Sequence, residues 1–227
     1  MSERSQVLPS EIAQATHSLL SGLGLNPEKN IHLIVSKAAD ILKCDCAAYG
    51  SLETAEGVLR FRAAHKLPAR PSTVRELARR ICSAIISGKQ AEAFLGTGAA
   101  GGETGPGAFR LGRSGLRAFL GHPVTVDGRK SGALVALHGS GREFSETDRQ
   151  VIALLAGMVA VEDLRLQREE ALSRRISFEI MLKDLSTMAI DAADAGLFTE
   201  HALAMVGSRM KVDSAFLWSF DPVTKTL

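Results

Sequence analysis

Two segments of this chain repeat one order of structural elements, and this repeat constrains the fold more than any other feature. Residues 11–51 align without a gap with residues 179–219. In both segments an amphipathic helix, a short break and a second helix lead into a strand that opens on lysine, an apolar residue and aspartate. The two strand sequences are KCDCAAYGSL from Lys43 and KVDSAFLWSF from Lys211. The chain is therefore predicted to hold one whole domain and the opening of a second domain of the same kind.

The second segment ends at Leu227, soon after its first strand, and a lone strand leaves its backbone groups without partners. We therefore expect the natural protein to be longer. The chain is predicted to divide into three regions: a domain at 1–150 whose closing helix continues to about 170, a linker and dimerisation helix at 151–190, and the beginning of a second, truncated domain at 191–227.

The composition is that of a soluble globular protein, with 45% hydrophobic and 23% charged residues. A formal net charge of +2, from 27 basic and 25 acidic residues, gives no broad electrostatic attraction to nucleic acid or to a membrane surface. The N-terminus has no apolar signal segment, and no apolar run reaches the roughly 18 residues of a membrane span. We expect a cytoplasmic fragment with no nucleic-acid partner and no membrane contact.

Local signals place the helices and strands of the first domain. Asn26-Pro27 is typical of a helix start, Thr73 is placed to begin a capping box, and Asp127-Gly128 predicts a tight hairpin between two strands. The predicted order is helices at 10–22 and 27–43, strands at 44–52 and 57–65, a helix at 74–87 stopped by Gly88, a short strand at 91–95, a glycine-rich loop at 96–115, and strands at 116–126 and 130–138.

A long helix is predicted from Glu146 to about Met188, with Ser145 as its cap and Asp148 completing the cap. Mostly apolar positions along it alternate spacings of three and four, which is typical of a coiled-coil seam, although Arg168 and Arg175 interrupt it. This pattern predicts a homodimer through residues 146–188. A kink or a helix break near Ser173 is the alternative. The seam consists of Leu154, Gly157, Val161, Leu164, Arg168, Ala171, Arg175, Phe178, Leu182 and Leu185.

The sequence from Leu116 to Leu164 resembles the late signature of a GAF domain. An apolar strand ends in Gly-x-Pro at 121–123, a short turn holds Asp127-Gly128, a glycine-bearing strand follows, and Phe-Ser-x-x-Asp at 144–148 opens the final helix. The resemblance covers residues 10–170 and resumes at about 178, so we interpret the chain as a tandem GAF sensory region of a bacterial signalling protein.

The resemblance implies an α+β fold: an antiparallel sheet with helices packed on one face and a lidded ligand pocket on the other, followed by a long linker helix. It also implies a non-catalytic sensory or regulatory module. A small molecule or a redox signal would alter the pocket, and the change would pass through a long dimeric helix to an output domain. The family suggests a sensor histidine kinase, a cyclic-dinucleotide enzyme or a transcriptional activator as that output.

Seven residues are predicted to line the pocket that the resemblance implies. Among them, Arg62 alternates with apolar residues and would favour an anionic ligand if it faced the pocket, whereas it would be an ordinary edge charge if it faced water. His122 and His138 lie near strand ends, where a haem or iron could find an imidazole, although a lone histidine is more often simply hydrogen-bonded. No cofactor, metal site or catalytic residue is assigned. The seven residues are Tyr49, Arg62, Cys82, Phe94, Phe119, His122 and His138.

The three cysteines leave a second interpretation open. Cys44 and Cys46 lie two apart on a predicted strand, so both thiols are expected on one face, where Cys82 of the middle helix could join them. Metal binding or redox sensing would need that arrangement, but buried packing is the common role of a free cysteine. A dimerisation scaffold with an empty pocket is the main rival function. A thiol-dependent methionine sulfoxide reductase, known as one GAF branch, is the weaker rival.

Overall fold

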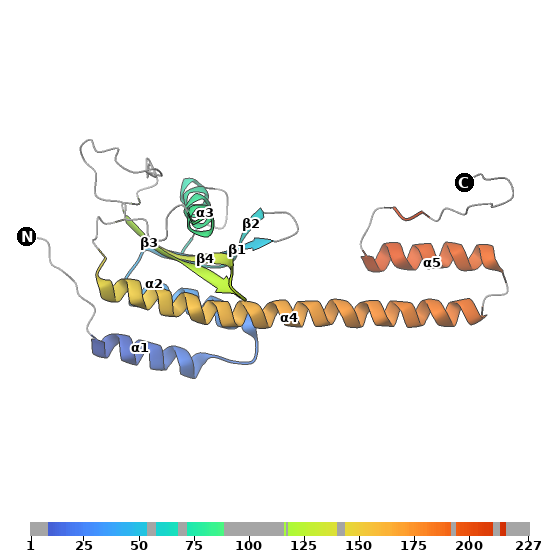
Figure 1. Ribbon diagram of the computed structural model, residues 1–227, viewed down its shortest axis with the longest axis horizontal. Helices are drawn as coiled ribbons and strands as arrows, with labels where there is room; N and C mark the ends of the chain where they lie inside the picture. The colour runs from blue at the N-terminus through green and yellow to red at the C-terminus, as the bar shows by residue number, and fades with distance from the viewer. Residues whose placement is uncertain are drawn as a thin grey trace, which may run out of the picture. The chain divides into compact units, whose positions relative to one another are not determined.

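The computed structural model forms two compact units, Met1–Leu166 and Gln167–Leu227, which we describe separately (Figure 1). The described residues are 9–53, 58–67, 72–88, 116, 118–139, 144–191, 194–210 and 214–216.

The first unit is built on one antiparallel sheet of four strands in the order β2-β1-β4-β3. Each strand pairs antiparallel with its neighbours, and the hairpin between β3 and β4 turns at Asp127 and Gly128, whose φ angles of 47° and 76° are both positive, as a tight two-residue hairpin requires. The predicted sheet is therefore confirmed. The strands are β1 (Cys46–Glu53), β2 (Val58–His65), β3 (Ala118–Val126) and β4 (Arg129–His138).

Two helices precede the sheet, α1 (Pro9–Gly22) and α2 (Pro27–Ile41). The predicted cap is confirmed, because the Asn26 side chain accepts a hydrogen bond from the backbone N–H of Lys29 at 2.9 Å. Apolar residues of α2 at helical spacing are buried against the sheet.

The middle helix α3 spans Thr73–Ile86. Its cap is Ser72 and not the predicted Thr73: the Ser72 hydroxyl accepts from the backbone N–H of Arg75 at 3.2 Å. The predicted stop is confirmed, since Gly88 follows the helix with a φ of 72°. The predicted short strand at 91–95 and the glycine-rich loop at 96–115 lie outside the described residues.

The helix α4 is continuous over Glu146–Asp191, so the alternative of a break near Ser173 is wrong. The cap predicted at its start is present: the Ser145 hydroxyl accepts from the backbone N–H of Asp148 at 3.1 Å, and the Asp148 carboxylate accepts from the backbone N–H of Ser145 at 2.8 Å. None of the described helices is both long enough and apolar enough to cross a membrane.

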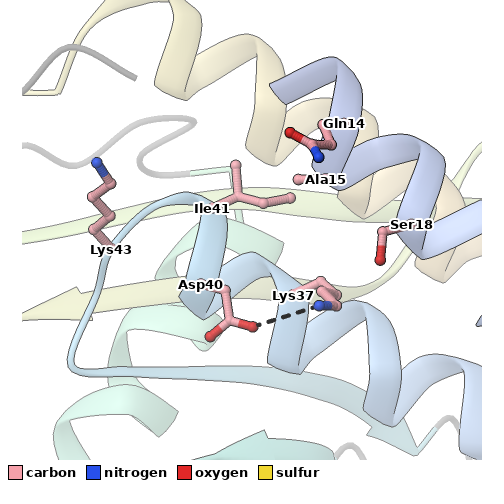
Figure 2. A pocket seen from close by; sticks show the side chains of 7 residues that line it. All are labelled: Gln14, Ala15, Ser18, Lys37, Asp40, Ile41 and Lys43. Carbon is pink, nitrogen blue, oxygen red and sulfur yellow. Dashed lines mark ion pairs between the residues drawn. The ribbon is translucent and has the colours of Figure 1, made fainter. Parts of the chain in front are cut away.

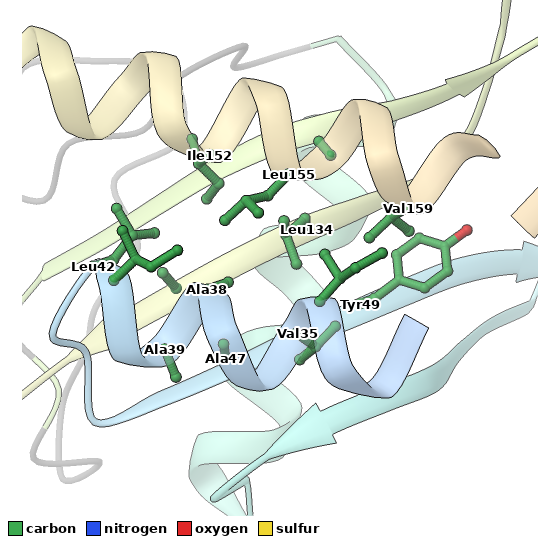
Figure 3. Packing of buried hydrophobic residues seen from close by; sticks show 14 of the residues in the cluster. Val35, Ala38, Ala39, Leu42, Ala47, Tyr49, Leu134, Ile152, Leu155 and Val159 are labelled. Atoms are coloured by element: carbon green, nitrogen blue, oxygen red, sulfur yellow. The ribbon is translucent and has the colours of Figure 1, made fainter. Parts of the chain in front are cut away.

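Apolar side chains cover both faces of the sheet. On one face, α2 and the first turns of α4 pack over strand residues such as Ala47, Tyr49 and Leu134 (Figure 3). On the other face, α3 packs over Ala48 and Phe119. Because successive residues of a strand point to opposite faces, each strand contributes side chains alternately to the apolar clusters on the two faces. We call these the α2/α4 face and the α3 face.

The second unit contains the end of α4 and the helix α5 (Ala195–Met210). The two helices are linked by an ion pair between Arg209 Nη2 and Asp184 Oδ2 at 3.1 Å, and Met181 is buried. The strand predicted after α5 falls mostly outside the described residues.

Candidate functional site

The α3 face is closely packed at the described residues. A Cβ atom on Gly121 would overlap Cδ1 of Ile85, and one on Gly50 would lie 3.2 Å from Sγ of Cys82. The absence of a side chain at both positions lets α3 approach the sheet this closely. Ile85, Cys82 and Phe119 are each almost fully buried in this layer.

The thiols are packed as apolar groups rather than gathered into a site. Cys44 precedes β1 and lies in the α2/α4 cluster, whereas Cys46 lies in the α3 cluster, so the prediction that they share a face is wrong. Burial raises the pKa of Cys44 and Cys82 to about 12 and that of Cys46 to about 11. At neutral pH all three stay protonated and weakly nucleophilic.

A cluster of polar and charged side chains lies on the α2/α4 face, where Arg62 of β2 approaches α4. Asp163 of α4 is fully buried, and its Oδ1 lies 3.7 Å from Nε of Arg62, whose side chain is 28% exposed. Tyr49 is also fully buried, and its hydroxyl lies beside Asp163, Ser51 and Ser131. Burial first, and the Asp163 charge second, raise the pKa of Tyr49, so its hydroxyl stays protonated and can donate a hydrogen bond.

A β-bulge in β2 places Arg62 on this face. Tyr49 pairs with Ala63 and Gly50 pairs with Phe61, so the register shifts by one residue and Arg62 is the extra residue of the bulge. Ala63 and Phe61 accordingly belong to opposite faces. Such a bulge redirects a side chain locally, and here it directs Arg62 to α4 instead of to the α3 face or fully into water.

The neighbouring carboxylate of α4 contacts a different element. Glu162 Oε2 accepts a hydrogen bond from Nδ2 of Asn30, near the start of α2, at 3.0 Å. Arg165 donates to the same oxygen at 2.8 Å and to the Leu25 carbonyl at 3.0 Å. Asn30 closes the loop before α2 by bonding both the N–H and the carbonyl of Gly24, at 2.8 and 2.9 Å. Two adjacent acidic residues thus tie α4 to β2 and to the beginning of α2.

The structure divides the residues predicted to line one pocket between the two faces. Cys82 and Phe119 lie on the α3 face, whereas Tyr49 and Arg62 lie on the α2/α4 face. Phe94 lies outside the described residues.

The two predicted histidines do not meet the α3-face residues. His138 is buried with its ring 5.3 Å from that of Phe144, which belongs to the α2/α4 cluster. His122 pairs with Leu134, another member of that cluster, and its Nδ1 lies 2.9 Å from the Pro123 carbonyl oxygen. Among the described residues, no three His, Cys, Asp or Glu side chains are placed to hold a metal ion.

Sequence reasoning missed Asn30, Glu162 and Asp163. The available signal was the pair Glu162-Asp163 directly after the apolar run AGMVAV, within the part of α4 that must face the sheet. A buried carboxylate needs a cation or donors, and Arg62 is one of only two arginines on the edge strand. The β-bulge determines which of these two arginines faces the buried carboxylate.

A shallow cavity of about 420 Å³ also lies between α1 and α2 (Figure 2). Lys37 at its edge faces Asp40 at 3.9 Å; the Lys37 side chain is half-buried and that of Asp40 is exposed. Its lining mixes single charges with Ala15 and Ile41, and its described polar residues are exposed or half-buried, so we do not take it as the candidate site.

Comparison with known proteins identifies the fold of the first unit. The sequence matches the GAF domain family over residues 26–162, more than half of the chain, and this match covers a single GAF domain. No curated protein is significantly similar to the whole sequence.

Solved structures share the fold at low sequence identity. The GAF domain of a phosphoenolpyruvate-protein phosphotransferase from Acinetobacter has a TM-score of 0.52 at 17% identity, covering 74% of this chain and 97% of that one. Bacteriophytochrome RpBphP3 from the photosynthetic bacterium R. palustris has a TM-score of 0.58 at 11% identity, covering 91% of this chain and 47% of that one. Free methionine-R-sulfoxide reductase from Neisseria meningitidis, solved with its substrate, has a TM-score of 0.50 at 15% identity, covering 66% of this chain and 84% of that one.

Proposed function

This chain belongs to the GAF domain family, and from that premise we propose that it is a non-catalytic regulatory module that passes a signal from its sheet to the helix α4. The observation that carries the proposal is the double role of this helix. Its first turns bury Ile152, Leu155 and Val159 against the sheet, and the same helix then continues without a break to Asp191. A change in the sheet could therefore act on a helix that is continuous beyond the sheet.

We propose that the chain forms a homodimer in which α4 packs against α4 of a second copy. Its side away from the sheet exposes Leu154 and Val161, by 52% and 59%. Gly157 lies between them, and nothing comes within 4 Å of where its Cβ would be. A glycine inside a helix costs about 1 kcal/mol relative to alanine, and no described neighbour in the chain needs it here. The predicted seam through Leu154, Gly157 and Val161 supplies a reason, because small residues let two helices approach closely.

Sedimentation velocity tests the dimer with two matched variants. Gly157→Leu is expected to convert the dimer to monomer, while Gly207→Leu is expected to leave it dimeric. The control is matched because Gly207 is also inside a helix and its Cβ would also meet nothing within 4 Å. A monomeric parent chain, or a Gly157→Leu variant that stays dimeric, would contradict this contact.

The sensory role predicts a small-molecule signal, and a scaffold without a ligand is the second candidate. Close packing at Gly121 and Gly50 favours the scaffold, because α3 leaves little space above those strands. Native mass spectrometry of freshly purified protein, with an absorption spectrum, separates the two. An added mass released on denaturation supports the sensor; a bare chain supports the scaffold.

Enzymatic reduction of methionine sulfoxide is the least supported function. That chemistry needs an accessible thiolate, and Cys44, Cys46 and Cys82 are buried with raised pKa values. The likeness to the neisserial reductase is one of fold. Sulfoxide-dependent oxidation of these thiols in the folded protein would restore the enzymatic proposal.

We further propose that residues 191–227 begin a second domain of the same kind, which makes the region a tandem. Asp194 caps α5 as Asn26 caps α2, at the equivalent position of the repeat: each side chain accepts from the N–H three residues later, Leu197 at 3.2 Å and Lys29 at 2.9 Å. The output domain of a signalling protein would then be controlled through these helices.

A further inference from the structure

We propose that Glu162 and Asp163 form a two-point clamp that fixes the rotation of α4 where the helix reaches the end of the first unit. The exit clamp consists of two contacts, Asp163 with Arg62 and Glu162 with Asn30. As a route for a signal it rests on the proposed regulatory function. As a mechanical feature of the domain it stands on the contacts alone.

The first contact joins α4 to the edge of the sheet. The Asp163 carboxylate is fully buried, and Arg62 approaches it at 3.7 Å from the bulge of β2. Burying a charge is costly unless a partner is well placed, so α4 is stable only where Asp163 and Arg62 can meet. An apolar side chain at position 163 would pack with no such requirement. The pair therefore specifies a position of the helix more than it adds stability.

The second contact joins α4 to the start of α2. Glu162 accepts from Asn30 at 3.0 Å, and Asn30 is itself fixed by its two hydrogen bonds to Gly24. Arg165 holds the same carboxylate from the next turn and reaches the Leu25 carbonyl. The bonded atoms of this contact belong to α2, to the loop before it and to α4, and none of them belongs to β2.

The two contacts together oppose rotation of α4. Consecutive residues of an α-helix project roughly 100° apart around its axis, so Glu162 and Asp163 reach different elements from one turn. Val159 is buried one turn earlier, and the first unit ends at Leu166, so the clamp lies at the last turn held by the domain. In the sheet formed by the described residues, the edge strand β2 pairs with β1 alone. A shift of β2 relative to α2 must therefore turn α4 or break one contact.

Hydrogen exchange measured by mass spectrometry tests the clamp in the whole chain. Asp163→Asn is expected to accelerate exchange in β2 (Val58–His65) by about tenfold or more, the factor that corresponds to about 1.4 kcal/mol, and to leave residues 24–30 unchanged. Glu162→Gln is expected to accelerate exchange in residues 24–30 and to leave exchange in β2 unchanged. The proposal is overturned if either variant accelerates exchange equally in both segments. It is also overturned if neither segment exchanges faster in either variant.

Two further variants guard against loss of folding. Arg62→Lys keeps the positive charge but loses the planar guanidinium group with its several N–H donors. It is therefore expected to accelerate exchange in β2 more weakly than Asp163→Asn. Glu146→Gln removes an exposed ion pair with Arg149 on the same helix and should change neither segment. If Arg62→Lys leaves β2 at its parent rate while Asp163→Asn fails to fold, the contact does not control β2 and the proposal is wrong. The exchange pattern does not depend on dimerisation or on a ligand. The clamp can therefore be wrong while the proposed function is right, and the proposed function can be wrong while the clamp is right.

Discussion

Tyr49 packs its ring against the backbone of Gly132 on the neighbouring strand, so closely that a Cβ atom on Gly132 would lie 2.6 Å from Cε2 of Tyr49. The same Cβ would come still closer to the carbonyl oxygen of Gly50. The missing side chain of Gly132 thus makes room for the largest aromatic ring on the α2/α4 face. The ring is thereby held with its hydroxyl near Asp163, whose negative charge adds to burial in raising the pKa of Tyr49.

Replacing Gly132 by alanine is expected to lower the free energy of unfolding by about 1–3 kcal/mol, because an added methyl group in a filled core forces neighbours to move. The backbone of Gly50 cannot yield as a side chain could. Urea denaturation followed by circular dichroism measures the effect.

The matched control is Gly24→Ala. Gly24 has nothing within 4 Å of its Cβ position, and alanine keeps the N–H that donates to Asn30. Its unfolding free energy should stay within about 0.5 kcal/mol of the parent. Equal losses for the two variants would mean that the Tyr49 contact is not the cause.

The helix cap of α3 gives a second prediction, because sequence and structure place it on different residues. Ser72→Ala is expected to lower the unfolding free energy by about 1 kcal/mol, since the Arg75 N–H loses its acceptor. Thr73→Ala should have a much smaller effect. Thermal unfolding of the two variants decides between the caps, and a larger loss for Thr73→Ala would show that the cap lies there.

Elements set by local chemistry could be predicted from the sequence. The starts at Asn26-Pro27 and Ser145 and the turn at Asp127-Gly128 each depend on a few adjacent residues, and all three are present. The cap of α3 was misplaced by one residue, because serine and threonine are both acceptable caps.

The site could not be predicted in the same way, because strand alternation shows which residues share a face but not which helix covers it. The bulge at Arg62 changes even the alternation. Cys44 was assigned to a strand that begins only at Cys46, so its direction was wrong. Arg62, the ion-pair partner of Asp163, is distant in sequence, and only the folded arrangement of β2 and α4 brings the two side chains together.

The buried thiols give a prediction on pH. In the unfolded chain a thiol has its ordinary pKa of 9.0, whereas burial raises the pKa of Cys82 to about 12 in the fold. The stabilisation is therefore fully present below pH 9 and is lost as the pH rises towards 12. At pH 10 the loss is on the order of 1 kcal/mol for this thiol.

Urea denaturation at several pH values between 8 and 10 measures this loss. Cys82→Ala removes the titrating group, so its unfolding free energy should fall less steeply over that range than that of the parent, even though the cavity makes it less stable throughout. Identical slopes for the two proteins would show that Cys82 ionises as easily in the fold as in the unfolded chain.

The cap of α5 provides the last prediction, which concerns the second unit alone. The Asp194 carboxylate accepts from the backbone N–H groups of Gly196 and Leu197 at 2.6 and 3.2 Å, and its negative charge also lies at the positive end of the helix. Asp194→Ala should therefore destabilise the first turn by about 0.5–2 kcal/mol and accelerate amide exchange there. Asp184→Ala, which breaks an exposed ion pair with Arg209, should alter exchange in that turn far less. Faster exchange in the Asp184 variant than in the Asp194 variant would mean that α5 depends on its contact with α4 rather than on its own cap, and the equivalence with Asn26 would then lose its physical basis.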